Sequence, residues 1–298
     1  MKKVEILGLG TVPDIKSGDK LADVIVRCTE DEVDGIREKD IIIITSKIVS
    51  KAENSVATLS EVKPGKEAMR LSRKTGKAAP KIQLILDNDQ EIVAVIPLAG
   101  LAEKYIMRST RRPDEVRQLL DKESCILVTR DRAGRVHTYD GGIDSSNHPE
   151  DIVSLPPSDP DRSATEIRQE IKRLTGKEVA VLIADTEIVP FGTMDIATGS
   201  SGIEIITKRF GELDRFGKPK FGGVDIIAYE LTAASALLFG QTDEGVPVAI
   251  IRGLDYEASE DETILNTLVP DRHQFNDTMS SAIRTTSSSK GFKEQMLS

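Results

Sequence analysis

Three short runs of apolar residues show no alternation with polar residues. They lie within residues 40–47, 178–186 and 248–252, and the first contains four consecutive isoleucines. A further strand is predicted to begin at Val4. A strand that is apolar at every position is typical of a sheet covered on both faces. The pattern therefore predicts a sheet whose central strands are buried on both sides.

The first half of the chain contains further helix and strand signals. Helices are predicted within residues 64–71 and 80–86, and a strand over 91–97. Residues 124–140 predict a hairpin, because two strand-like segments flank a turn rich in polar residues. The intervening segment, about 101–124, is strongly charged. We predict that it is an insertion on the surface.

A capping box gives the clearest helix signal. Ser163 is followed three residues later by Glu166, and Gly176 stands where a helix would end. Ile171 lies on the apolar face between them. We therefore predict a helix from 163 to 176 that leads into the buried strand ending at Asp185 and Thr186.

Another predicted helix is apolar on nearly all of its faces. Residues 224–239 carry only two charged side chains, Asp225 and Glu230. Such a helix is typical of a protein interior, where an unpaired carboxylate is strongly destabilising. Two explanations of Glu230 stay open: a functional carboxylate, or a structural ion pair with Lys51 or Arg252.

Composition excludes several classes of function. The chain has 298 residues, 39% of them hydrophobic, and a net charge of −9, which disfavours nucleic-acid and anionic-membrane binding. Cys28 and Cys125 are the only cysteines and three histidines are present, so we expect neither a disulfide framework nor a zinc site. Any metal should be a hard ion on oxygen ligands. With no signal peptide and no apolar run of ~18 residues, we predict a cytoplasmic protein.

Polar side chains cluster directly after the predicted strands. Residues 45–47 and Lys51 follow the first buried strand, Asp185 and Thr186 end the second, and residues 141–147 follow the hairpin. Ligands of open sheets commonly bind beyond strand ends. Carboxylates beside hydroxyl and amide groups suit Mg²⁺ or Mn²⁺ bridging phosphate oxygens. Each cluster alone also fits an ordinary turn or helix cap, so the prediction depends on the clusters coming together.

Five separated motifs carry a resemblance to a known family. In order along the chain they read TSKIVSKAEN, GGIDSSN, LPPSDPDRSATEIR, VAVLIADTE and FGGVDIIAYELTAASALLFGQTDEGVPVAIIRG. Together they resemble the coenzyme F420-0:L-glutamate ligase family, the gamma-glutamyl ligases of deazaflavin coenzyme biosynthesis. The resemblance covers about residues 1–254, apart from the segment near 101–124.

The resemblance implies a mixed α/β protein with the acyl-amino-acid ligase fold of that family, assembled as an intertwined homodimer. Residues 1–254 would form the ligase domain, as two closely packed α/β subdomains, and residues 255–298 a partly flexible C-terminal extension. The implied reaction joins L-glutamate through an amide bond to a deazaflavin F420 precursor, with conversion of GTP to GDP and phosphate. Two Mg²⁺ or Mn²⁺ ions are implied, with K⁺ as a further ion.

The resemblance also implies roles for individual side chains. Lys51 and Asp185 match catalytic positions. The implied metal ligands are Asp144, Asp185, Thr186 and Gln241. The implied nucleotide contacts are Val12, Pro13, Asp14, Ile15, Ser46, Lys47, Lys51, Asn147, Gly240 and Glu244.

Two positions depart from the family's pattern. Family members usually have Gly-Arg after the Asp-Thr pair and another arginine soon after, whereas this chain has EIVPFGTM over residues 187–194. The loss of two cations leaves the acceptor open, because arginine is well matched to phosphate and carboxylate. The family's usual Asn is Asp140 here, which we expect to add negative charge beside the metal site.

Three hypotheses of function follow. The leading one is a GTP- and metal-dependent F420 gamma-glutamyl ligase. The second is a ligase of the same family that uses a different acid. The third is a nucleotide-binding homodimer without ligase activity.

Overall fold

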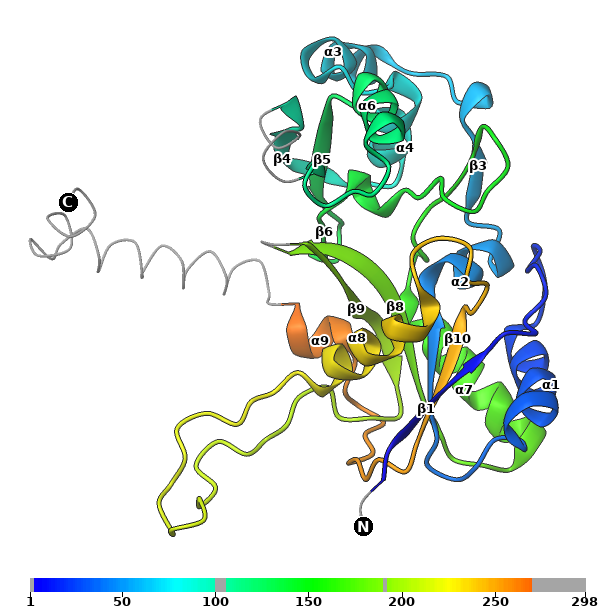
Figure 1. The fold of residues 1–298 in the computed structure, drawn as a ribbon, viewed down its shortest axis with the longest axis vertical. Coiled ribbons are helices and arrows are strands. Elements are labelled where there is room, and N and C mark those ends of the chain that lie inside the picture. The colour runs from blue at the N-terminus through cyan, green and yellow to red at the C-terminus, as the bar shows by residue number, and fades with distance from the viewer. Residues whose placement is uncertain (1–2, 100–105, 190–191, 270–298) are drawn as a thin grey trace, which may run out of the picture.

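The fold is built on a five-stranded sheet in the larger of two lobes (Figure 1). The computed structural model describes residues 3–99, 106–189 and 192–269. In the sheet β2 pairs in parallel with β8, and the other neighbours are antiparallel. The strand order is β1 (Glu5–Leu9), β10 (Val248–Arg252), β2 (Ile41–Thr45), β8 (Ala180–Val189) and β9 (Gly192–Ser201).

Helices cover both faces of this sheet. Alternate isoleucines of β2 point to opposite sides, and all four are fully buried. One side packs against α1 (Leu21–Val33) and α7 (Pro160–Thr175), and the other against α8 (Ile227–Phe239) and α9 (Ile264–Leu268). The prediction of central strands buried on both faces is confirmed, and so is the mixed α/β class.

The smaller lobe has a core of its own. Ile82, Ile85 and Leu127 are fully buried at its centre. Within 101–124, α6 has no buried residue. The lobe contains α3 (Lys66–Thr75), α4 (Ala79–Asp87), β4 (Glu91–Pro97), α6 (Pro113–Lys122) and the hairpin of β5 (Cys125–Arg130) and β6 (Val136–His137).

Between the lobes, β3 (Val56–Thr58) pairs with β7 (Ile152–Ser154), and α2 (Ser46–Ala52) follows β2 directly. The C-terminal part of the predicted flexible extension, residues 270–298, lies outside the described residues, and the division into domains stays a prediction. In the part of the chain that the structure describes, no helix is long and apolar enough to cross a membrane.

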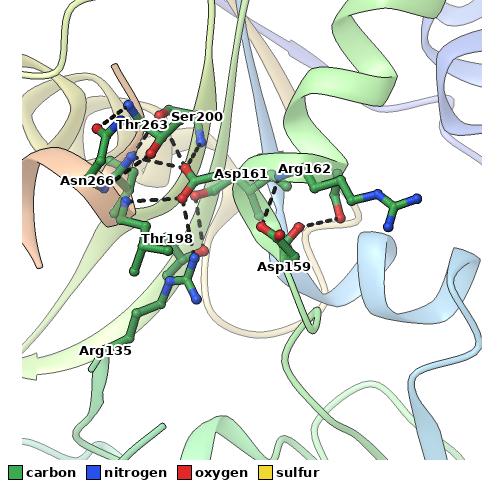
Figure 2. Close-up of polar contacts among 12 residues, drawn as sticks. Arg135, Asp159, Asp161, Arg162, Thr198, Ser200, Thr263 and Asn266 are labelled. Carbon is green, nitrogen blue, oxygen red and sulfur yellow. Dashed lines mark hydrogen bonds and ion pairs between the residues drawn. The ribbon is translucent and has the colours of Figure 1, made fainter. Parts of the chain in front are cut away.

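The predicted start of α7 is wrong. The helix begins at Pro160, and the side chain of Asp159 caps it by accepting the Arg162 N–H at 3.1 Å (Figure 2). Ser163 lies inside the helix and donates its hydroxyl to Glu53. Proline in the first turn, directly after an Asp cap, is a stronger start signal than the capping box downstream.

Asp161 in the first turn of α7 ties four elements together (Figure 2). Its carboxylate accepts the backbone N–H groups of Ser200 at 2.9 Å, Ile264 at 3.0 Å and Leu265 at 3.1 Å. The Arg135 guanidinium, from the β5–β6 turn, lies 3.3 Å away. A buried carboxylate with this many donors fixes β9, α9 and the smaller lobe to the helix.

The predictions for the end of β8 and for the interior helix are also wrong. β8 continues beyond Asp185 to Val189, because it pairs with β9 along its whole length. On α8, Glu230 is exposed and Leu237 is 84% exposed, so the helix covers the sheet with one side only. Glu230 therefore needs no buried partner.

The two cations proposed for Glu230 have other partners. Lys51 pairs with Asp14 at 2.9 Å. Arg252 forms a two-pronged ion pair with the buried Asp40, at 3.0 Å and 2.7 Å.

Candidate functional site

A cavity of about 690 Å³ lies where the parallel pairing of β2 with β8 ends, at Thr45 and Ala184. The segment after β2 leaves the sheet at this edge, and β8 continues along the cavity with Asp185 and Thr186 on the lining. Parts of five segments line the cavity: residues 12–15, 45–51, 139–147, 184–195 and 239–247. The clusters singled out in the sequence therefore do come together.

Most of the predicted site residues line this cavity, and Glu244 does not. Glu244 instead accepts the Thr242 N–H at 2.8 Å and folds back against Gly240. Gly240 has a φ of +67°, and a Cβ there would lie 2.0 Å from the Glu244 carboxyl carbon, so this turn requires glycine. The predicted residues on the lining are Val12, Pro13, Asp14, Ile15, Ser46, Lys47, Lys51, Asp144, Asn147, Asp185, Thr186, Gly240 and Gln241.

Lys47 holds the loop that carries Asp144. Its ammonium lies 2.7 Å from the Asp144 carboxylate and donates to the hydroxyl and carbonyl oxygens of Ser146, at 2.7 Å and 3.0 Å. Burial alone would raise the pKa of Asp144, but Lys47 and the N–H and hydroxyl of Ser146 outweigh it and hold the pKa below its usual range. Asp144 is therefore an ionised carboxylate on the cavity wall.

Lys51 is a second cation on the lining, and its partner is easily displaced. The partner, Asp14, is largely exposed, and its hydrogen bond from Lys51 lowers the pKa of its carboxyl. The loop before Asp14 is held by Glu32, which accepts the N–H groups of Gly10 at 2.9 Å and Thr11 at 3.0 Å. Because exposed ion pairs contribute little to stability, Lys51 can turn to an anionic ligand at small cost.

A second group of carboxyl side chains on the lining, Asp185 and Asp195, disfavours the charged form. Burial, and then the nearby Glu187, raise the pKa of Asp185 to about 7. Burial also raises the pKa of Asp195, which accepts the Thr186 hydroxyl at 2.7 Å. Gln241 reaches the same hydroxyl at 3.4 Å. In the absence of a cation, Asp185 is thus about half protonated at neutral pH.

The donor set fits a hard divalent cation that arrives with a ligand. Asp144, Asp185, Thr186 and Gln241 offer carboxylate, hydroxyl and amide oxygens, which are the donors that Mg²⁺ and Mn²⁺ prefer. Among the described residues, however, no three or more Asp, Glu, His or Cys side chains are grouped closely enough to hold a metal ion. Mg²⁺ is commonly bound by one or two carboxylates together with substrate phosphates. The cavity fits a metal ion bound partly by protein carboxylates and partly by substrate phosphates, and does not fit a site made of protein ligands alone.

The lining also contains residues that were not predicted as site residues, and three of them bear on the chemistry: Tyr139, Glu187 and Asp195. Asp195 lies opposite Thr186 in the β8–β9 register. Only the pairing of these two strands shows that it faces the site, and the sequence did not predict β9. Asp140, which we expected to add charge beside the metal site, is fully buried in the smaller lobe and pairs with Lys77, so that prediction is wrong.

Replacement of Asp185 by Asn should stabilise the ligand-free protein. The pKa of Asp185 is 3.8 in the unfolded chain and about 7 in the folded protein. The folded protein therefore becomes less stable relative to the unfolded chain as the pH rises from about 4 to 7. The advantage of Asp185→Asn in free energy of unfolding should therefore grow across that range and reach on the order of 2–4 kcal/mol at pH 8. Urea titrations at pH 5 and pH 8 measure it, with Asp121→Asn on α6 as the control. A variant less stable than the wild type at pH 8 would contradict the assignment.

Comparison with known proteins identifies the family of the chain. The family model described as F420-0:Gamma-glutamyl ligase matches residues 10–253. The Coenzyme F420:L-glutamate ligase of Methanothermobacter thermautotrophicus is 33% identical over 252 residues, which cover 84% of this chain and 89% of the relative. The protein of the same name from Methanocaldococcus jannaschii is 36% identical over 256 residues, covering 85% and 88%. The resemblance seen in the five motifs is confirmed, and the chain belongs to the F420-0:gamma-glutamyl ligase family.

Proposed function

We propose that this protein is a GTP- and divalent-metal-dependent ligase that forms an amide bond between L-glutamate and the acid of a deazaflavin F420 precursor. The observation that carries the proposal is one cavity that combines two lysines with an ionised Asp144 and a titratable Asp185. This cavity lies within the family match. The relatives named Coenzyme F420:L-glutamate ligase support the same substrate pair.

The chemistry explains why such a cavity needs both kinds of charge. A carboxylate does not condense with an amine at neutral pH, because its oxygen is a poor leaving group. Transfer of the γ-phosphoryl group of GTP to the acceptor carboxylate gives an acyl phosphate and GDP. The glutamate amine then attacks the acyl carbon, forms the amide and releases phosphate and a proton.

Within this reaction the protein's own groups have separable tasks. Lys51 would neutralise charge on the transferring phosphoryl group, since positioned cations are the main stabilising element in phosphoryl transfer. Lys47 would orient Asp144. Asp144, Asp185, Thr186 and Gln241 would hold a Mg²⁺ or Mn²⁺ ion, which would supply positive charge against the phosphate groups.

The wall beyond Asp185 favours an acceptor of low negative charge. Glu187 and Ile188 face the cavity where the family pattern has arginine, and Lys47 and Lys51 are the only Lys or Arg side chains on the described lining. Glu187 is 5% exposed and accepts the Thr138 N–H at 2.7 Å, so it is fixed in place. This observation supports the second hypothesis, a ligase of the same family with a different acid.

Product analysis tests the proposal. The protein is incubated with GTP, Mn²⁺, glutamate and a panel of acids that includes the deazaflavin precursor, and products are identified by mass spectrometry. We expect GDP release only when both glutamate and a suitable acid are present. Lys51→Met should lower turnover by on the order of 10²-fold with little change in stability, whereas Lys16→Met, on the same face outside the lining, should change neither. GDP release independent of glutamate, or full activity of Lys51→Met, would refute the mechanism.

We also propose that the protein acts as a homodimer. Residues 207–225 form a hairpin arm that extends away from the sheet (Figure 1), held by bonds such as Arg209 N–H to the Gly223 carbonyl at 3.0 Å. Phe216 and Phe221 on the arm are 85% and 93% exposed. The arm has five basic and three acidic residues, whereas the whole chain has a net charge of −9. A cationic arm with exposed phenylalanines fits the acidic surface of a second copy.

Removal of the arm's aromatic side chains should separate the dimer. Light scattering of the wild type should give about twice the chain mass of 32.5 kDa. The double variant Phe216→Ser/Phe221→Ser should give one chain mass, because the apolar area that drives association is lost. Val136→Ser, an exposed apolar position on the smaller lobe, should remain dimeric. A monomeric wild type would overturn this part of the proposal.

A further inference from the structure

The smaller lobe contains a buried ion pair that no part of the reaction uses. Lys77 is 2% exposed and Asp140 is fully buried, and their charged groups lie 2.5 Å apart. Lys77 also contacts Glu123 and donates to the Cys125 carbonyl at 2.9 Å. Burial alone would lower the pKa of Lys77, but Asp140 and Glu123 outweigh it and raise the pKa, so Lys77 is a cation. A buried pair is costly to form, because both charged groups lose their hydration.

Asp140 begins a turn with an unfavourable backbone conformation. The φ angles of Asp140, Gly141 and Gly142 are +45°, +72° and +72°. For a residue with a side chain this region is sterically unfavourable. The turn is pinned on both sides: the Asp140 carboxylate accepts the Leu127 N–H at 3.0 Å, and Gln90 donates to the Gly141 carbonyl at 2.9 Å.

The residues that flank the turn, Tyr139 before it and Asp144 after it, line the cavity. On its far side Ile143 is buried in the small-lobe core, and Asp144 then exchanges backbone hydrogen bonds with Ser154 at 3.0 Å and 2.8 Å. On its near side Tyr139 lines the cavity, with Lys77 5.9 Å from its ring centre. The position of Asp144 relative to Lys47 thus depends on the shape of the turn.

We propose that Lys77 and Asp140 are positioning residues for the candidate site, because their buried ion pair holds the 139–143 turn in the shape that presents Asp144 and Tyr139 to the cavity. The inference rests on the proposed function only for the role of Asp144 in metal-dependent nucleotide binding. Its structural part, that the pair controls the turn, stands independently.

The physical reason lies in what loss of Lys77 does to Asp140. Without the ammonium, the buried Asp140 carboxyl group would remain in an apolar core with no cation beside it, which is strongly unfavourable. The Asp140 side chain can escape this unfavourable burial by turning toward water, and the left-handed conformation of the 139–143 turn is then lost. Glu123 differs, since its side chain is 29% exposed and pairs with Lys77 and Lys81 but has no ion pair with the turn.

Four variants separate the positioning role from general stability. Lys77→Met should increase amide hydrogen exchange of residues 139–147 at least tenfold, and weaken Mn²⁺-dependent GTP binding at least tenfold. Glu123→Gln, which removes the charge of the other carboxylate beside Lys77, should leave hydrogen exchange and GTP binding within twofold of the wild type. Asp140→Asn added to Lys77→Met should restore both, because Asn keeps an acceptor for the Leu127 N–H and tolerates a left-handed backbone. Asp140→Ala should reproduce the loosened turn without stranding a buried carboxylate, in case Lys77→Met does not fold.

Hydrogen exchange by mass spectrometry and calorimetric titration of GTP with Mn²⁺ give the two readouts. Unchanged exchange of residues 139–147 in both Lys77→Met and Asp140→Ala would overturn the proposal. Equal effects of Lys77→Met and Glu123→Gln, or no restoration in the double variant, would also overturn it, because the effect would then not arise from the charge of Asp140. A wild type that binds no GTP with Mn²⁺ would refute the proposed function, while the exchange data would still decide the structural part.

Discussion

The site depends on the parallel pairing of β2 with β8. The register aligns Thr45 with Ala184, so Ser46 and Lys47 leave one strand beside Asp185 on the other. Both strands are buried on both faces, and a slip of one residue would move every core side chain to the wrong side. The hydrophobic core therefore fixes Lys47 relative to Asp185, and the geometry of the site does not rely on loops alone.

The charged groups Lys47, Lys51, Asp144 and Asp185 on the lining each have a partner in the ligand-free protein. Lys47 neutralises Asp144, Asp14 occupies Lys51, and a proton partly neutralises Asp185. Under the proposed function, nucleotide and metal would replace the last two partners, while the Lys47 clamp would stay. The smaller lobe contributes through the 139–143 turn, whose buried ion pair lies outside the cavity but determines where Asp144 points.

The sequence predicted the sheet core and the polar clusters at residues 45–51, 141–147 and 185–186, because buried strands and the polar residues near their ends are local signals, whereas the residues at 12–15 and 240–241 were predicted from the family resemblance alone. It failed where the decisive partner is distant in the chain. Asp195 faces the site only because β9 pairs with β8, and Asp140 is buried only because Lys77 lies beneath it. Glu230 was misread because an apolar helix that covers one side of a sheet has the same composition as an interior helix. Asp159 was missed as the cap of α7 because Ser163 offered a competing signal four residues later.

Under the proposed function, Asp185, partly protonated in the free protein, becomes a carboxylate ligand when nucleotide and metal bind. Proton release during titration with Mn²⁺ and GTP, measured by calorimetry in buffers of different ionisation enthalpy, tests this directly. On binding, Asp185 of the wild type should release about 0.8 proton at pH 6.5 and about 0.1 at pH 8, as a pKa of about 7 requires. Equal proton release at the two pH values would contradict this role of Asp185.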